Sequence, residues 1–260
     1  MITMPFPKCE RVIYGKNPLV EVTCQINFKP TGDPIRADQA LKIHSLISSD
    51  FPQFNIAKKV VVEIQAPNNQ VVSTEEPTYE FSTLDGHTKV VLLQGSVAIV
   101  TSQYKNWEIF SSSLSTFLDK GFFSVLSMGA VERIGLRYKD VIQRTDLGLE
   151  DRPWSELLNP YISSIYEDGN VIANNVVGAQ TTLNIKLGES EGMLTMIHGL
   201  VKNNATQEQC FLIDGDFFYE GAVEYGAVNG FLDKFHDSAR NMFRWCISDV
   251  VHRSLQPAEV

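Results

Sequence analysis

A strict alternation of apolar and polar residues marks the first strand that the sequence predicts. From Val20 to Phe28 every second residue is apolar, and the residues between them are Glu, Thr, Gln and Asn. A period of two is typical of a strand that buries only one face. A similar pattern occurs at Val131–Ile142, whose polar positions are mostly basic. We therefore expect two long, half-buried strands.

Three short strands followed by a helix occur twice along the chain. Apolar residues at three- and four-residue steps predict the two helices, at 107–120 and at about 228–254, and a shorter one at Ala37–Ser49. We expect the helix at 107–120 to end at Gly121, because glycine is common just after a helix. The six strands are predicted at Tyr79–Ser82, Thr88–Leu93, Val97–Ser102, Val177–Leu187, Met193–Val201 and Gln209–Phe218, and the helices should bury Trp107, Phe110, Leu114, Phe235, Met242 and Phe243.

These elements predict an α+β fold with two β-β-β-α units and a long C-terminal helix. Because short turns join the strands, antiparallel sheet with helices on one face is the simplest way to bury every apolar face. We expect an N-terminal half at 1–142, a connection at 143–175 and a C-terminal half at 176–260, with one continuous domain as the alternative. A single helix-grip domain is disfavoured by the interior helix at 107–120.

Charge is unevenly distributed along the chain. The 260 residues carry a formal net charge of −9, and residues 131–260 contain 11 Lys and Arg against 19 Asp and Glu. With no surplus of cations to neutralise phosphates, nucleic acid is not the expected partner. The acidic half could attract a basic protein instead, or could simply be a solvated surface. If it binds a protein, Glu220, Glu224 and Asp233 are the expected contact residues.

The cysteines and the N-terminus predict a cytoplasmic protein. Cys9, Cys24, Cys210 and Cys246 show no paired spacing, as is typical of thiols in a reducing compartment. Prolines interrupt the first apolar residues, so we expect no signal peptide. The longest apolar runs are far shorter than the roughly 20 residues that span a bilayer, so we expect no membrane association.

Two acidic residues on one predicted strand are the strongest candidates for catalysis. Asp214 and Asp216 should project from the same face, where paired carboxylates can hold Mg²⁺ for phosphoryl transfer. The sequence lacks a glycine-rich phosphate loop, and a solvent-facing pair at a sheet edge is the more economical interpretation. His236 is a weaker candidate, because its neighbour Asp237 points about 100° away on a helix and cannot readily orient it. We expect no metal site and no cofactor.

The basic positions of the strand at 131–142 have two interpretations. Arg133, Arg137 and Lys139 alternate along one face. They could bind an anionic ligand, or they could pair with acidic residues of the other half across the sheet. We favour pairing, because it would join the two halves.

Four segments resemble a known family: Tyr14–Glu21 (YGKNPLVE), Arg133–Tyr138 (RIGLRY), Trp154–Pro160 (WSELLNP) and Trp245–Asp249 (WCISD). The chain is similar to a family of uncharacterised bacterial proteins of about this length that occur sporadically and have no assigned activity. The resemblance implies a bacterial origin and a mobile gene, as is common for defence or toxin-neutralising functions. It supplies no catalytic residue.

Three functions follow as hypotheses. The leading one is a non-enzymatic binding protein of the bacterial cytoplasm, whose partner is a protein such as a toxin or defence effector. The second is a metal-dependent hydrolase or nucleotide-processing enzyme that uses Asp214 and Asp216. The third is a small-ligand binder with a pocket between helix and sheet.

Overall fold

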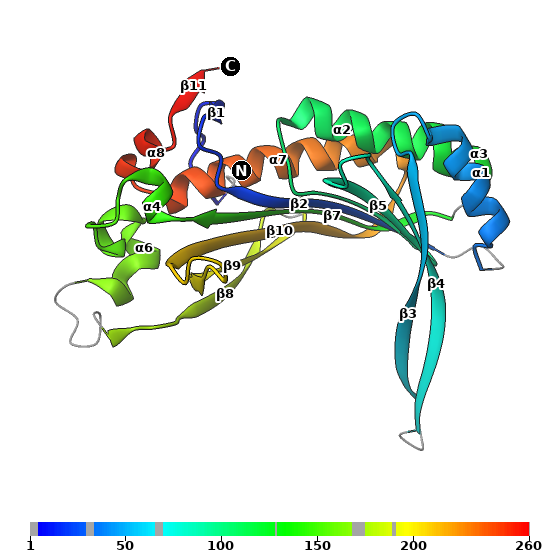
Figure 1. The fold of residues 1–260 in the computed structure, drawn as a ribbon, viewed down its shortest axis with the longest axis horizontal. Coiled ribbons are helices and arrows are strands. Elements are labelled where there is room, and N and C mark those ends of the chain that lie inside the picture. The colour runs from blue at the N-terminus through cyan, green and yellow to red at the C-terminus, as the bar shows by residue number, and fades with distance from the viewer. Residues whose placement is uncertain are drawn as a thin grey trace. The chain divides into compact units, whose positions relative to one another are not determined.

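The fold is α+β, as the sequence predicts. The computed structural model describes residues 5–29, 34–65, 70–127, 129–167, 175–188 and 191–259. Within these residues nine strands form a mostly antiparallel sheet in the order β3-β4-β5-β6-β2-β7-β10-β9-β8, and β1 pairs with β11 separately (Figure 1). Residues 168–174 of the predicted connection lie outside the described residues.

The chain divides into two compact units. Unit 1 comprises Met1–Val22, Gly135–Glu220 and Gly226–Val260, and unit 2 comprises Thr23–Ile134 and Gly221–Tyr225. Three strands of the sheet, β2, β7 and β10, each begin in one unit and end in the other. The units therefore have different bounds from the predicted halves.

Unit 2 consists of an antiparallel set of strands and a group of helices. The hairpin of β3 and β4 has the register Gln53↔Ser82, and β5 and β6 form a second hairpin with Thr88↔Thr101. The elements that lie wholly or partly in this unit are β2 (Leu19–Phe28), α1 (Ala37–Ile47), β3 (Gln53–Gln65), β4 (Gln70–Ser82), β5 (Thr88–Leu93), β6 (Ser96–Thr101), α2 (Trp107–Thr116), η1 (Phe117–Phe122), α3 (Phe123–Val125), β7 (Val131–Ile142), β10 (Gln209–Val223) and η4 (Tyr225–Ala227).

The helix predicted at 107–120 does not end at Gly121. It begins at Trp107, where the side chain of Asn106 accepts a hydrogen bond from the Ile109 amide, and it continues as the π-helix η1 and then as α3. Gly121 lies within η1, and a Cβ at this position would be 2.9 Å from Cγ2 of Ile47 on α1. The glycine therefore allows two helices to approach closely, which is a packing role rather than a capping role.

Unit 1 places a long helix on one face of its strands. The ring of Phe235 on α7 contacts Phe217 on β10, and Met242 lies against Gly215. The predicted core residues Phe110, Leu114, Phe235, Met242 and Phe243 are buried, whereas Trp107 is only partly buried. The remaining elements of this unit are β1 (Val12–Tyr14), α4 (Arg144–Leu147), α5 (Trp154–Leu157), α6 (Pro160–Ser163), η2 (Ser164–Tyr166), β8 (Gln180–Lys186), β9 (Met193–Lys202), α7 (Val228–Cys246), α8 (Asp249–Ser254) and β11 (Pro257–Glu259).

The C-terminal helix is interrupted earlier than the sequence predicts. The helix α7 ends at Cys246, Ile247 is extended and forms a β-bridge with Leu158, and the side chain of Ser248 then accepts the hydrogen bond that starts α8. Asp249 forms an ion pair with Arg244 on α7. The single long helix expected to reach about Ser254 is therefore two helices, because Ile247 takes part in a pairing with a distant segment.

Candidate functional site

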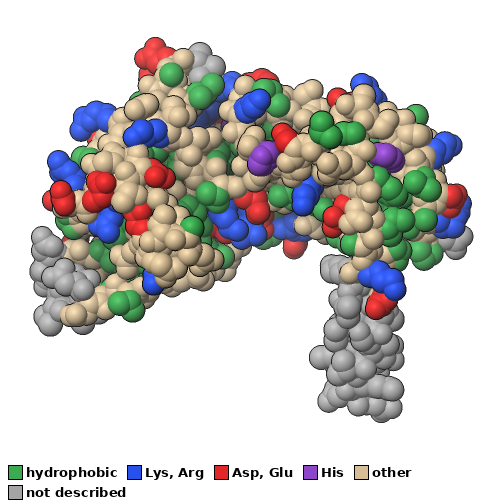
Figure 2. Space-filling view, viewed as in Figure 1, with side chains coloured by type: hydrophobic (Ala, Val, Ile, Leu, Met, Phe, Trp, Pro, Cys, Tyr) green, Lys and Arg blue, Asp and Glu red, His purple; other side chains and the backbone are tan. Residues whose placement is uncertain are grey.

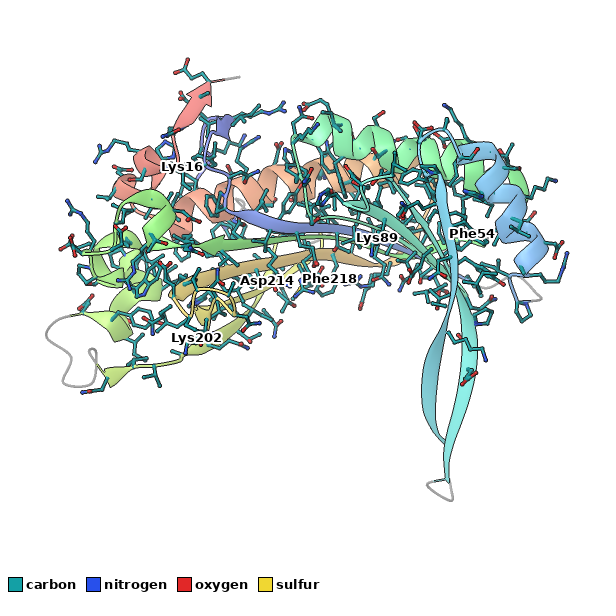
Figure 3. The ribbon with its side chains drawn as sticks, viewed as in Figure 1. Lys16, Phe54, Lys89, Lys202, Asp214 and Phe218 are labelled. Atoms are coloured by element: carbon teal, nitrogen blue, oxygen red, sulfur yellow. The ribbon has the colours of Figure 1, made fainter. Side chains whose placement is uncertain are left out.

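The strongest candidate site is the face of the unit 1 sheet that is turned away from α7. On β10 the side chains of Phe211, Ile213 and Phe217 are fully buried on the helix side, and the alternate residues Leu212, Asp216 and Phe218 are half-exposed. Figure 3 labels Asp214 and Phe218 on this second side of β10. We call it the open sheet face and define it by the side chains of Arg137, Lys139, Thr182, Asn184, Thr195, Ile197, Leu212, Asp214, Asp216 and Phe218.

Cross-strand register places these side chains in rows. Thr182 on β8 pairs with Ile197 on β9, which pairs with Asp214 on β10. The next row along this face joins Asn184 and Thr195, whose hydroxyl donates a 3.0 Å hydrogen bond to the Asn184 side chain. The face is therefore continuous across three strands, because paired residues of an antiparallel sheet project to the same side.

A bidentate ion pair lies at the centre of the open sheet face. Nε of Arg137 donates to Oδ1 of Asp214 at 2.7 Å, and Nη2 donates to Oδ2 at 2.5 Å. The Asp214 residue is 3% exposed, whereas the Arg137 side chain is 41% exposed. The hydrogen-bonded carboxylate raises the pKa of Arg137. Both oxygens of Asp214 are already engaged, so a metal ion could bind there only by displacing the guanidinium.

The carboxylate pair is not at an edge of the sheet. Strand β10 lies between β7 and β9 in the sheet order, which corrects the expectation of a solvent-facing pair on an edge strand. Asp216 is half-exposed beside the buried Asp214, and its charge also raises the pKa of Arg137. The two carboxylates share a face as predicted from their spacing, but Asp214 is an ion-pair partner in the interior of the sheet.

The other predicted basic residues differ in their surroundings. Nζ of Lys139 is 3.9 Å from Oε1 of Glu21, which is a long ion pair on the same strand face as Arg137. Arg133 is partly buried and lies in unit 2. The Arg137–Asp214 ion pair therefore joins a strand of the predicted N-terminal half to a strand of the predicted C-terminal half. Both residues belong to unit 1.

Sequence analysis missed Asp140, the most strongly perturbed acid of the described residues. Asp140 lies on β7, on the side opposite Arg137, and is 4% exposed. Burial raises its pKa well above the ordinary range, and the nearby negative charge of Asp214 raises it further. The signal was present in the alternation of β7, because Asp140 has the same parity as the buried residues Leu136 and Tyr138.

His236 is part of the packing between α7 and the sheet. Its Nδ1 is 2.9 Å from the hydroxyl oxygen of Tyr138, and the two groups share a hydrogen bond. The neighbouring Asp237 forms an ion pair with Arg240, one turn further along α7. The two residues are therefore engaged with different partners, and Asp237 does not act on His236.

The three acidic residues proposed for partner binding are exposed but lie in different units. Glu220 and Asp233 belong to unit 1, and Glu224 belongs to unit 2. Glu224 also lines a pocket of unit 2, which sequence analysis did not predict.

Other site types receive no support from the described part of the chain. Among those residues, no group of three or more His, Cys, Asp or Glu side chains is arranged to hold a metal ion. No described helix is both long and apolar enough to cross a bilayer. A scan against protein-family models and a search of curated proteins find no match to this chain.

Proposed function

We propose that the protein is a non-enzymatic binding protein of the bacterial cytoplasm, and that its open sheet face engages a basic protein. The observation that carries the proposal is the make-up of this face. Three half-exposed apolar side chains share this face with the Arg137–Asp214 ion pair. Ile197 on β9 pairs with Asp214, and Leu212 and Phe218 lie on β10 two and four residues from Asp214. Apolar side chains beside an arginine are typical of protein interfaces.

Charge supports a basic partner. Residues 135–220, which belong to unit 1, contain 6 Lys and Arg against 13 Asp and Glu. Asp146, Glu150 and Asp151 are exposed in and after α4, and Figure 2 shows acidic side chains among basic ones over the α4–α6 region. Such a surface would accelerate the approach of a cationic protein through long-range attraction.

The biological setting rests on the thiols and on the family resemblance. All four cysteines are free, which suits a reducing compartment. The resemblance suggests that the partner is a toxin or another defence effector. The product of a neighbouring gene is therefore the first partner to test.

Two adjacent threonines provide a matched test of the open sheet face. Thr181 and Thr182 are both exposed on β8, but Thr182 pairs with Ile197 of the open sheet face and Thr181 pairs with His198 on the opposite face. We expect Thr182→Arg to weaken binding of the neighbouring gene product by at least tenfold, and Thr181→Arg to leave it unchanged. Calorimetric titration of both variants measures the difference, and equal affinities would refute the assignment of this face.

Salt dependence tests the charge of the partner. The association rate should fall markedly between low and physiological salt, where the Debye length shrinks to about 8 Å, and the dissociation rate should change less. Replacing Glu220, Glu224 and Asp233 together by neutral amides should flatten this dependence if these residues belong to the contact. An association rate that is independent of salt would contradict a basic partner, and tight DNA binding in a shift assay would overturn the partner class.

A metal-dependent enzyme is the second candidate, because Asp214 and Asp216 do share one strand face. It predicts stoichiometric Mg²⁺ or Mn²⁺ binding that is lost in the Asp214→Asn, Asp216→Asn double variant. Our proposal predicts that the wild-type protein binds neither ion at this site, since Arg137 occupies both oxygens of Asp214. Calorimetric titration with each ion distinguishes the two.

A further inference from the structure

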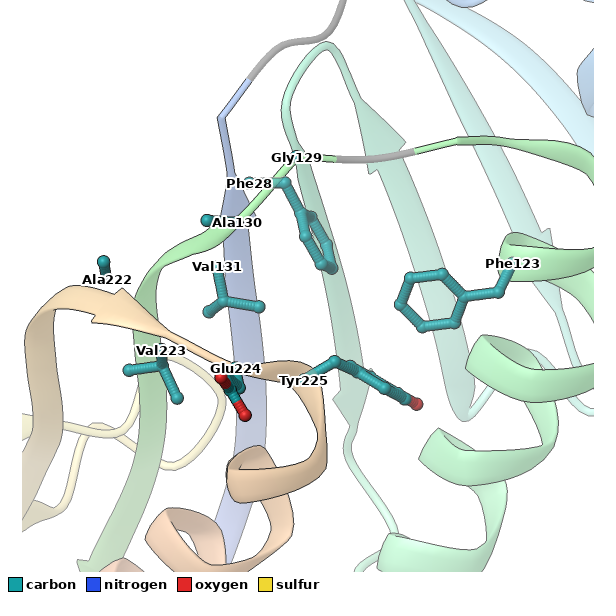
Figure 4. A pocket seen from close by; sticks show the side chains of 9 residues that line it. All are labelled: Phe28, Phe123, Gly129, Ala130, Val131, Ala222, Val223, Glu224 and Tyr225. Carbon is teal, nitrogen blue, oxygen red and sulfur yellow. The ribbon is translucent and has the colours of Figure 1, made fainter.

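Unit 2 contains an apolar pocket that is separate from the open sheet face. Its volume is about 390 Å³, within the range of small-molecule sites. It is formed where β2 and β10 end, where β7 begins, and where α3 starts (Figure 4). Nine residues line it: Phe28, Phe123, Gly129, Ala130, Val131, Ala222, Val223, Glu224 and Tyr225.

Three aromatic rings form one wall of this pocket and hold one another in place. Phe28 and Phe123 are in edge-to-face contact at 6.0 Å between ring centroids, and Phe123 and Tyr225 are at 4.3 Å. The Tyr225 hydroxyl donates a 3.0 Å hydrogen bond to Asp119 on η1, which fixes the ring. The planes of these two pairs meet at 84° and 62°, so the three rings present their faces in different directions, as in sites that surround a cationic group.

The charge that lines this pocket is negative. Glu224 is the single charged side chain among the nine lining residues of the described chain, and it is exposed at the pocket. A second carboxylate, that of Asp119, lies next to the pocket as the acceptor of the Tyr225 hydrogen bond. An anionic ligand would be repelled here, and a neutral hydrogen-bond donor would interact less strongly with the carboxylate than a cation would.

We propose that this pocket binds an alkylammonium group, with the alkyl chain against Val131, Val223 and the aromatic wall and the ammonium group beside Glu224. The apolar lining contributes affinity by burying the methylene groups, and the rings and the carboxylate together select the positive charge. A free amine and the side chain of a lysine in another protein share this chemistry. The proposal does not depend on the open sheet face.

Methyl NMR of the full-length protein with labelled valines tests the proposal directly. Two lining residues, Val131 and Val223, carry the reporter groups. The probes are n-hexylammonium, n-hexanol and hexanoate, which share a six-carbon chain and differ in charge, together with N-acetyl-lysine methylamide. We expect hexylammonium to shift the Val131 and Val223 methyl signals with at least fivefold higher affinity than hexanol, and hexanoate to bind least.

Substitutions at the pocket distinguish the contribution of the carboxylate charge to ligand affinity from that of the aromatic ring. Glu224→Gln should lower the hexylammonium affinity about fivefold and leave the hexanol affinity unchanged, as expected for one partly solvated ion pair. Glu10→Gln removes an exposed carboxylate that does not line the pocket; it is the matched control and should change neither affinity. Phe123→Leu should weaken hexylammonium more than hexanol, because leucine keeps the apolar contact and lacks the ring.

The source of the ammonium group follows from the fourth probe. Binding of N-acetyl-lysine methylamide as tightly as hexylammonium supports a protein side chain as the ligand, and failure of this probe alone supports a free amine. Equal affinities for hexylammonium, hexanol and hexanoate would overturn the proposal. It would also be overturned if hexylammonium left the Val131 and Val223 signals unchanged while the wild-type spectrum showed a folded protein.

Discussion

Removing Arg137 from the Arg137–Asp214 ion pair should lower the stability of the fold more than removing Asp214. Asp214 is 3% exposed, and the Arg137 side chain is 41% exposed. Arg137→Met therefore leaves a carboxylate buried without its counter-charge, which costs about 3–5 kcal/mol in other proteins. Asp214→Asn leaves a cation that water already reaches, so we expect a loss of only about 1–2 kcal/mol. The double variant Arg137→Met, Asp214→Leu should lie within about 1 kcal/mol of the wild type.

Urea unfolding followed by tryptophan fluorescence measures these differences, because Trp154 is buried in unit 1 beside Phe211.

Two results would refute this reasoning. Equal losses of less than about 0.5 kcal/mol for both single variants would mean that the pair behaves as an exposed salt bridge. The double variant Arg137→Met, Asp214→Asn combines the two single substitutions, and a loss equal to the sum of the two single losses would mean that the side chains are not coupled.

Three further changes test the packing and the electrostatics of the two units. Burial raises the pKa of Asp140, so the folded carboxyl holds its proton more tightly than the unfolded one. The free energy of unfolding of the wild type should therefore fall as the pH rises above about 4, by about 1.4 kcal/mol per pH unit. Asp140→Asn should remove this slope, as measured by urea unfolding between pH 4 and 8. Gly121→Ala should lower the free energy of unfolding by about 1–2 kcal/mol, because its Cβ would be 2.9 Å from Ile47. Gly230→Ala on α7, where an added Cβ would meet no atom beyond the helix's own backbone and the adjoining residues, should raise it by about 0.5–1 kcal/mol, and the reverse order would contradict the packing of α1. Phe243→Ala should cost about 3–5 kcal/mol in the same assay, because Phe243 is 8% exposed and its ring contacts Tyr14, and a loss below about 1 kcal/mol would show that this side chain is not enclosed.

Local periodicity predicted several of the main elements of the fold. The alternation from Val20 to Phe28 predicted β2, and the apolar spacing after Trp107 predicted α2. The π-helical continuation through Gly121 was not predictable, because a glycine after an apolar stripe is as typical of a helix end as of a close helix contact. The break at Ile247 was also missed, although Ser248 is a good helix start, because the pairing of Ile247 with Leu158 is a long-range contact.

The candidate site was only partly predictable for the same physical reason. Spacing placed Asp214 and Asp216 on one face of their strand and Arg137 on the polar face of another strand, but only the order of strands in the sheet brings Arg137 next to Asp214. Strand order depends on tertiary contacts that one sequence does not display. The pocket of unit 2 depends on them too, since Phe28, Phe123 and Glu224 are far apart along the chain.

The interrupted course of unit 1 has a consequence for how the protein is made. Residues 23–225 are synthesised between the first segment of unit 1, Met1–Val22, and its last, Gly226–Val260. At roughly 5–20 residues per second this interval lasts roughly 10–40 s. Most of unit 2 is one continuous stretch, Thr23–Ile134, and can begin to fold on the ribosome. Residues of β7 that α7 later covers, such as Tyr138, must wait until α7 has been synthesised, and until then they are exposed to chaperones, proteases and other nascent chains.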